Sequence, residues 1–100
     1  MKTIMVRYKT APQYADDNES LVRAVFAQLK TNAPKGIRYA TFRLEDGVSF
    51  MHIASVDSTD HNPLVELPAF KAFQRELKQR CVEPPVITEL SAIGSYGVTP

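Results

Sequence analysis

The segment from Gly36 to Val56 constrains the fold of this chain more than any other. It holds two runs in which apolar and polar residues alternate, and the runs meet at Asp46-Gly47. Such a pair is a strong signal for a tight turn, because glycine adopts a positive φ without strain and aspartate tolerates one. We therefore predict two antiparallel strands joined by a two-residue loop. A three-residue loop, Glu45-Asp46-Gly47 with a bulge, is the alternative.

The two-residue loop decides which side chains share a face of the hairpin. It sets Arg43 opposite Phe50 and Thr41 opposite His52, and opposed residues lie on the same face. One face is then apolar, with Ala40, Phe42, Leu44, Met51 and Ile53. The other is mixed, with Ile37, Tyr39, Thr41, Arg43, Phe50, His52, Ala54 and Val56. We expect the apolar face to lie under helices and the mixed face to be open, since this choice separates the two kinds of residue most cleanly.

The rest of the chain supplies two further strands and two helices. Alternating residues predict a strand over 3–10 and another over 86–93, whereas apolar residues four apart predict a helix over 14–30. A second helix, with Cys81 on its buried stripe, is expected over 68–81 and is ended by the prolines that follow it. The order β-α-β-β-α-β predicts a ferredoxin-like α+β fold, a four-stranded antiparallel sheet with two helices on one face.

Length and composition limit the classes of function. Residues 1–100 suffice for one domain with one core, and 44% hydrophobic against 23% charged residues is typical of a globular chain. The net charge of +1 gives no electrostatic basis for a nucleic-acid or membrane partner. The single cysteine excludes an intrachain disulfide, and no apolar run has the length of a signal peptide core or a membrane span. These features predict a cytoplasmic protein.

An open mixed face predicts self-association. Two helices cover only one face of such a sheet. Apolar surface that stays exposed on the other face lacks the stabilising free energy of burial, about 25 cal/mol per Å². A second copy, packed sheet on sheet about a two-fold axis, would cover it, so we expect a homodimer. Where the two sheets do not meet tightly, a cavity would remain between them.

The hairpin, the NPLVELPAF segment before the second helix and the PPVITEL segment of the last strand resemble small proteins of the dimeric α+β barrel superfamily. They are most similar to the antibiotic biosynthesis monooxygenase-like group. This resemblance implies a dimeric barrel and activities such as cofactor-independent oxygenation of polycyclic phenols, haem degradation or lactone isomerisation. The oxygenases and haem degraders of this group commonly use a tryptophan in the cavity. This sequence has no tryptophan, so no catalytic residue is transferred from the group.

The candidate site residues come from the mixed face. As catalytic residues we predict His52 to accept a proton from a phenol or enol, Arg43 to hold the resulting anion and Tyr39 to orient an oxygen. Substrate-binding candidates are Thr41, Phe50 and, if it faces the cavity, Tyr8. The alternative is structural: His52 and Tyr39 would then be interface residues, and Arg43 would reach the rim or pair with a carboxylate.

The sequence thus predicts a monooxygenase-like protein that binds or oxidises a small aromatic or enolisable molecule, or binds an anionic one, in the barrel cavity without a cofactor. A non-catalytic homodimeric module that binds a small ligand or has a structural role is the alternative. Asp57, Asp60 and His61 lie in one loop, where turn chemistry accounts for them, so we predict no metal site.

Overall fold

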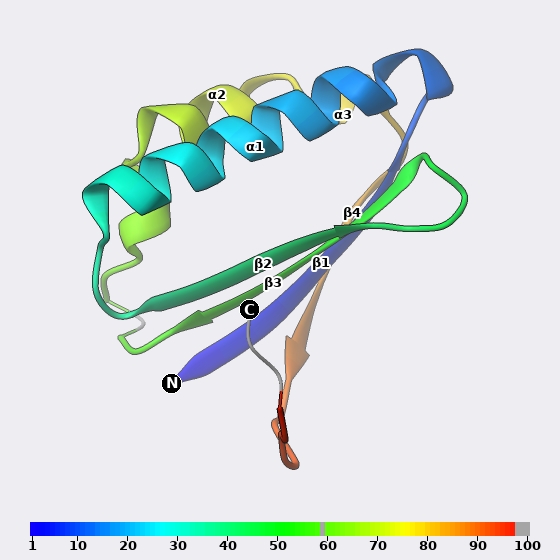
Figure 1. Cartoon of the computed structure of the whole chain (residues 1–100). Coiled ribbons are helices and arrows are strands. Elements are labelled where there is room, and N and C mark those ends of the chain that lie inside the picture. The colour runs from blue at the N-terminus through cyan, green and yellow to red at the C-terminus, as the bar shows by residue number, and fades with distance from the viewer. Residues whose placement is uncertain (59, 98–100) are drawn as a thin grey trace.

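The computed structural model describes residues 1–58 and 60–97. The elements follow the predicted order, with short 3₁₀-helices η1 and η2 added: β1 (Lys2–Thr10), η1 (Pro12–Tyr14), α1 (Ala15–Asn32), β2 (Ile37–Arg43), β3 (Ser49–Val56), η2 (Pro63–Glu66), α2 (Pro68–Arg75), α3 (Leu77–Arg80) and β4 (Cys81–Leu90). All the described α-helices lie on one side of the sheet, and no described helix covers the other side, here called the uncovered face (Figure 1). The predicted ferredoxin-like α+β fold is confirmed.

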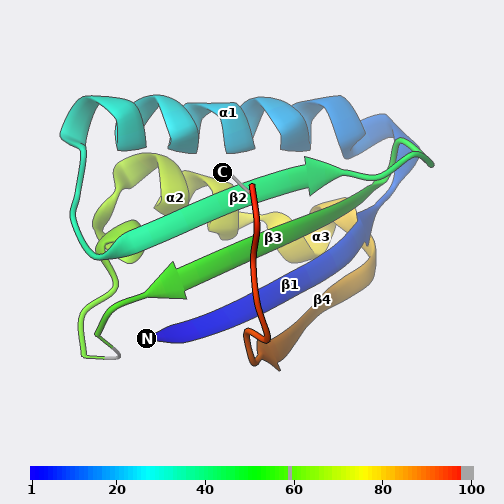
Figure 2. The same cartoon turned by 60° about the horizontal axis from the view of Figure 1, so that its bottom comes forward.

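The four strands lie in the order β2-β3-β1-β4, and each neighbouring pair is antiparallel (Figure 2). The register predicted for the hairpin is confirmed, with Arg43 opposite Phe50 and Thr41 opposite His52. β3 and β1 are therefore the central strands, and the middle of each is covered by helices. Side chains that these two strands direct toward the helices are removed from water.

The hairpin turn contains Asp46 and Gly47 and keeps the predicted register, but it is longer than the predicted two-residue loop. The Leu44 N–H donates to Ser49 O at 2.8 Å, and the Gly47 N–H donates to Leu44 O at 2.9 Å. Gly47 has a φ of 77°, in the left-handed region that favours glycine. The Asp46 carboxylate accepts hydrogen bonds from the Ser49 hydroxyl at 2.6 Å and from the backbone N–H groups of Ser49 and Val48 at 2.8 and 3.0 Å. The Ser49 hydroxyl and these amides lower the pKa of Asp46 to about 2. The turn residues thus fix the register that the faces depend on.

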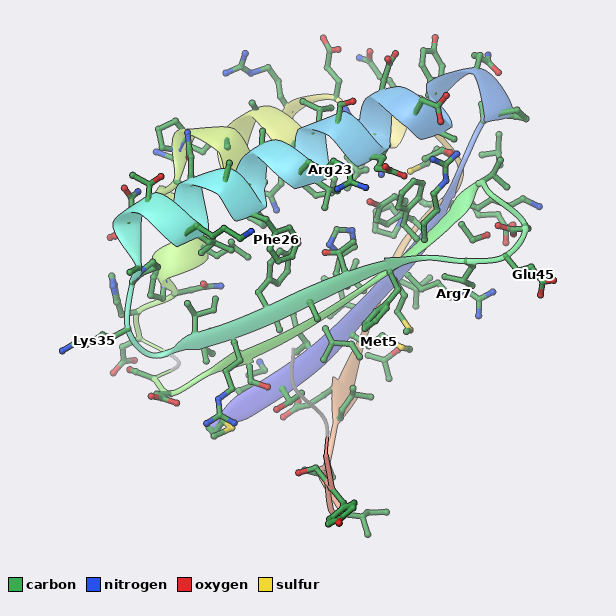
Figure 3. All side chains as sticks on the ribbon, viewed as in Figure 1. Met5, Arg7, Arg23, Phe26, Lys35 and Glu45 are labelled. Carbon is green, nitrogen blue, oxygen red and sulfur yellow. The ribbon has the colours of Figure 1, made fainter. Side chains whose placement is uncertain are left out.

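The assignment of the two sheet faces from sequence is wrong. The mixed face lies under the helices, where Phe50 is 1% exposed and His52 is 4% exposed. Met5 projects from the opposite side of the sheet, whereas Phe26 of α1 lies between helix and sheet (Figure 3). The mixed face carries the larger rings, and every buried side-chain polar atom among the described residues has a hydrogen-bond partner. Paired polar groups cost little on burial, so their presence does not exclude a face from the core.

The second helix and the last strand also differ from the prediction. The helix ends at Arg75, a short α3 follows, and β4 begins at Cys81, which is therefore a strand residue rather than part of a helical stripe. Pro84-Pro85 lies within β4, because an edge strand with register shifts tolerates missing N–H donors. The strand does not reach Ile93, since Leu90 already pairs with Thr3 near the start of β1.

Candidate active site

His52 lies at the centre of the buried sheet face, on β3, between strands β1 and β2. Its Nε2 lies 2.8 Å from the hydroxyl of Tyr8. Its Nδ1 lies 2.5 Å from the hydroxyl of Tyr39 and 3.0 Å from that of Thr41. Both ring nitrogens are therefore hydrogen bonded, and strands on either side of His52 fix the orientation of the imidazole.

Aromatic rings surround this group and keep water away. The His52 ring centroid lies 5.3 Å from those of Tyr8 and of Phe73 on α2, and the Tyr39 ring stacks on Phe26 of α1 at 5.2 Å. Burial lowers the pKa of His52 to about 4, because the charged imidazolium loses its hydration. Histidine at this position is thus neutral at neutral pH.

The two tyrosines are also affected by burial. Burial raises the pKa of Tyr39 to about 12, against the opposing effect of a hydrogen bond with Thr41. Burial also raises the pKa of Tyr8 above its ordinary value, and the amide of Asn18 opposes this shift. Both phenols therefore keep their protons at neutral pH, and each is a donor as well as an acceptor of hydrogen bonds.

A pocket of about 440 Å³ lies between the sheet and the segment formed by η2, α2 and α3. Its lining is mostly apolar: Ile4, Val6, Tyr8, Tyr39, His52, Ala54, Asn62, Leu64, Val65, Phe70, Phe73, Gln74, Leu77, Lys78, Pro85 and Ile87. Among these lining residues, Lys78 alone carries a formal charge. Ile87 of β4 and Lys78 of α3 are exposed, so the pocket is open to solvent on this side. The pocket that His52 and Tyr39 line thus lies within one chain, beneath the helices, and a cavity between the sheets of two chains stays a prediction.

Hydrogen bonds continue from Tyr8 to two residues that sequence reasoning missed. The amide Nδ2 of Asn18 on α1 donates to the Tyr8 hydroxyl at 2.8 Å, and Arg80 Nε donates to Asn18 Oδ1 at 3.1 Å. Asn18 precedes Val22 by four residues on the buried stripe of α1, and a polar residue on such a stripe is a usable signal. Arg80 gives no comparable signal, because its burial depends on the unpredicted break between α2 and α3.

Arg43 and Phe50 lie outside the His52 pocket. Arg43 Nη1 lies 2.9 Å from Glu19 Oε1 and 3.1 Å from Asp16 Oδ1, both on α1. Its guanidinium carbon lies 5.6 Å from the centre of the Phe50 ring, and both residues line a separate pocket of about 200 Å³. Of the predicted site residues, the structure therefore brings together His52, Tyr39, Tyr8 and Thr41. A catalytic role for Arg43 stays a prediction.

The described ranges contain neither a cluster of metal-ligating side chains nor a membrane-spanning helix. Within residues 1–58 and 60–97, no three His, Cys, Asp or Glu side chains lie close enough together to hold a metal ion. No helix in the described part of the chain has the length and apolarity needed to cross a membrane. His61 contacts Glu66 at 3.8 Å and lies far from His52 in the sequence.

Solved structures share this architecture. A Nitrosomonas europaea protein provisionally named an antibiotic biosynthesis monooxygenase is 12% identical, with a TM-score of 0.77 over 94% of this chain and 100% of its own. A Caulobacter crescentus protein with the same provisional name is 23% identical, with a TM-score of 0.68 over 93% and 90% of the two chains. Rv0793 from Mycobacterium tuberculosis is 17% identical, with a TM-score of 0.73 over 94% and 96%.

These similarities define the class of fold. The chain has the ferredoxin-like fold of solved structures named as antibiotic biosynthesis monooxygenases, in agreement with the resemblance seen in its sequence. Particular neighbours, such as Rv0793, match nearly the whole chain in both directions. No family model matches the chain, and no curated protein matches its sequence. At these identities the likeness establishes the fold, and function must be argued from the site.

Proposed function

We propose that the chain is a cofactor-independent monooxygenase-like enzyme that oxidises a small aromatic or enolisable molecule in the pocket beneath α2. The observation that carries this proposal is the neutral, buried His52 held between Tyr8 and Tyr39 at one wall of an apolar pocket of about 440 Å³. Apolar walls with a few convergent polar groups are typical of sites for small organic ligands. The provisional names of structural neighbours support the same class of activity.

In this proposal the Tyr39 phenol binds the oxygen of the substrate, and His52 holds the phenol in place. A pKa of about 4 makes His52 a weak base at neutral pH, and both of its ring nitrogens already have partners. The geometry therefore favours a hydrogen-bonding role for His52 over direct proton abstraction. Lys78 at the pocket mouth would favour an anion. A donor aimed at the substrate oxygen favours its enolate or phenolate against the apolar wall of the pocket.

The electron-rich anion would then react with dioxygen itself. The substrate releases its proton to water at the open pocket mouth. A ring carbon then forms a bond to one oxygen atom of dioxygen, and the resulting peroxide anion takes up a proton from water. The O–O bond breaks, the carbon loses its hydrogen, and water leaves. One substrate and one dioxygen thus give one quinone-type product and one water, with the substrate as the only reductant.

Removing the Tyr39 hydroxyl tests the proposal. Anthrone, an enolisable tricyclic ketone, serves as the probe, with oxygen consumption measured above the rate without protein. We expect Tyr39→Phe to lower turnover on the order of 100-fold, because a donor to the developing oxyanion is lost. The matched control is Tyr14→Phe, since Tyr14 lies exposed on η1, away from the pocket. Its turnover should equal that of the unchanged protein.

A measurement of anthrone binding distinguishes the proposed enzyme from a non-catalytic carrier. Anthrone that binds without oxygen consumption, with weaker binding to Tyr39→Phe, would contradict the enzyme and favour a non-catalytic carrier. If neither binding nor oxidation occurs with anthrone or with polycyclic phenols, the proposed ligand class is wrong.

We also infer that the uncovered face of the sheet associates with a second copy of the chain. This face carries Met5, Ala40, Phe42, Met51, Ile53 and Val86, and the helices cover only the opposite face (Figure 1). Phe42 is 50% exposed and Val86 is 63% exposed. Cross-strand pairing sets Phe42 beside Met51, and Ile53 between Ala40 and Met5, and exposed apolar surface of this kind commonly marks an interface. The homodimer expected from the sequence thus uses the face opposite to the one first assigned.

A charge on this face should separate the copies. Ile53→Asp would bury a carboxylate between Ala40 and Met5, the apolar residues opposite it on β2 and β1, so we expect dimer affinity to fall about 100-fold or more. Sedimentation should change from a mass near twice 11.2 kDa to that of one chain. Ala24→Asp, on the exposed side of α1, is the control and should leave the mass unchanged. A monomeric unchanged protein would contradict the inference.

A further inference from the structure

The hydrogen bonds around His52 form one continuous chain through the core. It starts at Arg80, passes through Asn18, Tyr8 and His52, and ends at Tyr39, which lines the pocket. These residues come from opposite ends of the sequence and from both helices and strands. The direction in which each hydrogen bond donates along this chain decides whether Tyr39 is a donor or an acceptor toward a ligand.

Arg80 fixes the first step. Its side chain is 7% exposed, and within the described residues no carboxylate lies at ion-pair distance from it. Its Nη2 instead donates to the Phe73 carbonyl at 2.7 Å, and its Nε donates to Asn18 Oδ1 at 3.1 Å. A guanidinium has no acceptor, so the Asn18 atom facing it must be the carbonyl oxygen. The amide NH₂ of Asn18 is thereby directed at Tyr8.

The second step follows from the first. Because Asn18 Nδ2 donates to the Tyr8 oxygen at 2.8 Å, the Tyr8 proton needs a different acceptor. Among the described residues, the one acceptor recorded within hydrogen-bond distance is Nε2 of His52, at 2.8 Å. Tyr8 therefore donates to Nε2, which must carry no proton in the neutral ring. The single proton of the imidazole is then on Nδ1, where it points to Tyr39 and Thr41.

We propose that Arg80 and Asn18 are positioning residues that hold His52 in the Nδ1–H tautomer, so that the Tyr39 hydroxyl directs its own proton into the pocket. The opposite tautomer would place two donors against the Tyr8 oxygen and leave the buried Tyr8 proton without a partner. That penalty should favour the Nδ1–H form by about tenfold or more. Hydrogen bonds aligned in one direction also polarise one another, and here the first donor is a cation.

The consequence for a ligand rests on the proposed function. A Tyr39 hydroxyl that already accepts from Nδ1–H keeps its own proton to donate, so it favours a ligand oxygen that accepts a hydrogen bond. A carbonyl, enolate or phenolate oxygen meets this requirement. Arg80 and Asn18 would act on such a ligand without touching it, since neither lines the pocket.

Ring-nitrogen chemical shifts of ¹⁵N-labelled histidine test the tautomer in the ligand-free protein at pH 7.5. The chain has only two histidines, so His61→Gln assigns the spectrum. We expect Nδ1 of His52 to resonate as a protonated nitrogen and Nε2 as an unprotonated one. A protonated Nε2 in the unchanged protein overturns the proposal without any variant or ligand, and it leaves the proposed function to its own assay.

Asn18→Asp is the matched variant, because it keeps the shape of the side chain and strengthens the contact with Arg80. A carboxylate accepts and does not donate, so the Tyr8 proton should turn to residue 18 and Nε2 should become the protonated nitrogen. A purely structural role for Asn18 would not move the proton. A folded variant with the unchanged tautomer therefore overturns the proposal. Asp17→Asn, exposed on the neighbouring position of α1, is the control and should leave the shifts in place.

Discussion

Replacing Phe50 with aspartate should unfold the protein. Phe50 is 1% exposed, and its ring stacks on that of Tyr8 with centroids 5.6 Å apart. Loss of a buried phenylalanine ring costs about 3–5 kcal/mol, and an unpaired buried carboxylate adds several more. Domains of this size have about 5–15 kcal/mol of stability in total, so little or none would remain. Circular dichroism with urea titration measures the result.

Phe42→Asp is the matched control, because Phe42 lies half exposed on the opposite face of the same hairpin. We expect this variant to keep its helices and strands in the monomeric form, with any loss confined to self-association. A folded but monomeric Phe50→Asp protein would instead restore the face assignment made from the sequence. The pair of variants thus decides which side of the sheet is the core.

Acid should destabilise the protein through His52. The folded-state pKa of about 4 lies below the ordinary value of 6.5, so between these values the unfolded chain binds a proton that the folded chain does not. The stability associated with the neutral ring is fully present above pH 6.5 and is lost as the pH falls toward 4. Between pH 7.5 and 4.5 this one group should remove about 2.5 kcal/mol from the free energy of unfolding.

Urea unfolding at the two pH values gives the measurement. His52→Gln should lose less stability than the unchanged protein over this interval, because glutamine does not titrate while it keeps hydrogen-bonding capacity. Carboxylates contribute to the loss of stability in both proteins. Subtracting one loss from the other removes the carboxylate contribution. His61→Gln, which retains the buried histidine, should behave as the unchanged protein does. Equal losses in all three proteins would contradict burial of a neutral His52.

Local patterns predicted the elements and their pairing. Asp46-Gly47 specified the turn, and period-two alternation then set Thr41 opposite His52, because both signals depend on residues close together in the chain. The bounds of β1 and α1 followed for the same reason. β4 was misplaced because proline is a poor strand former in general, whereas an edge position next to a register shift accommodates it.

The candidate site was predicted only in part, because its environment is made by distant residues. His52, Tyr39, Thr41 and Tyr8 were identified and do meet, since strand pairing alone brings them together. The face they occupy was misjudged, since the partners that satisfy buried polar atoms are not adjacent in sequence. Arg80 reaches Asn18 across a separation of 62 residues, and no local pattern encodes that contact.

The two prolines of β4 affect how copies of this chain can meet. Pro84-Pro85 lies where the pairing of β4 with β1 is irregular, and it removes two consecutive backbone N–H donors from β4. Another strand that approached this edge would find no regular series of N–H donors at that position. Proline and a bulge on an edge are common protections against open-ended growth into aggregates. The edge at β4 therefore discourages endless edge-to-edge stacking and leaves association to the uncovered face.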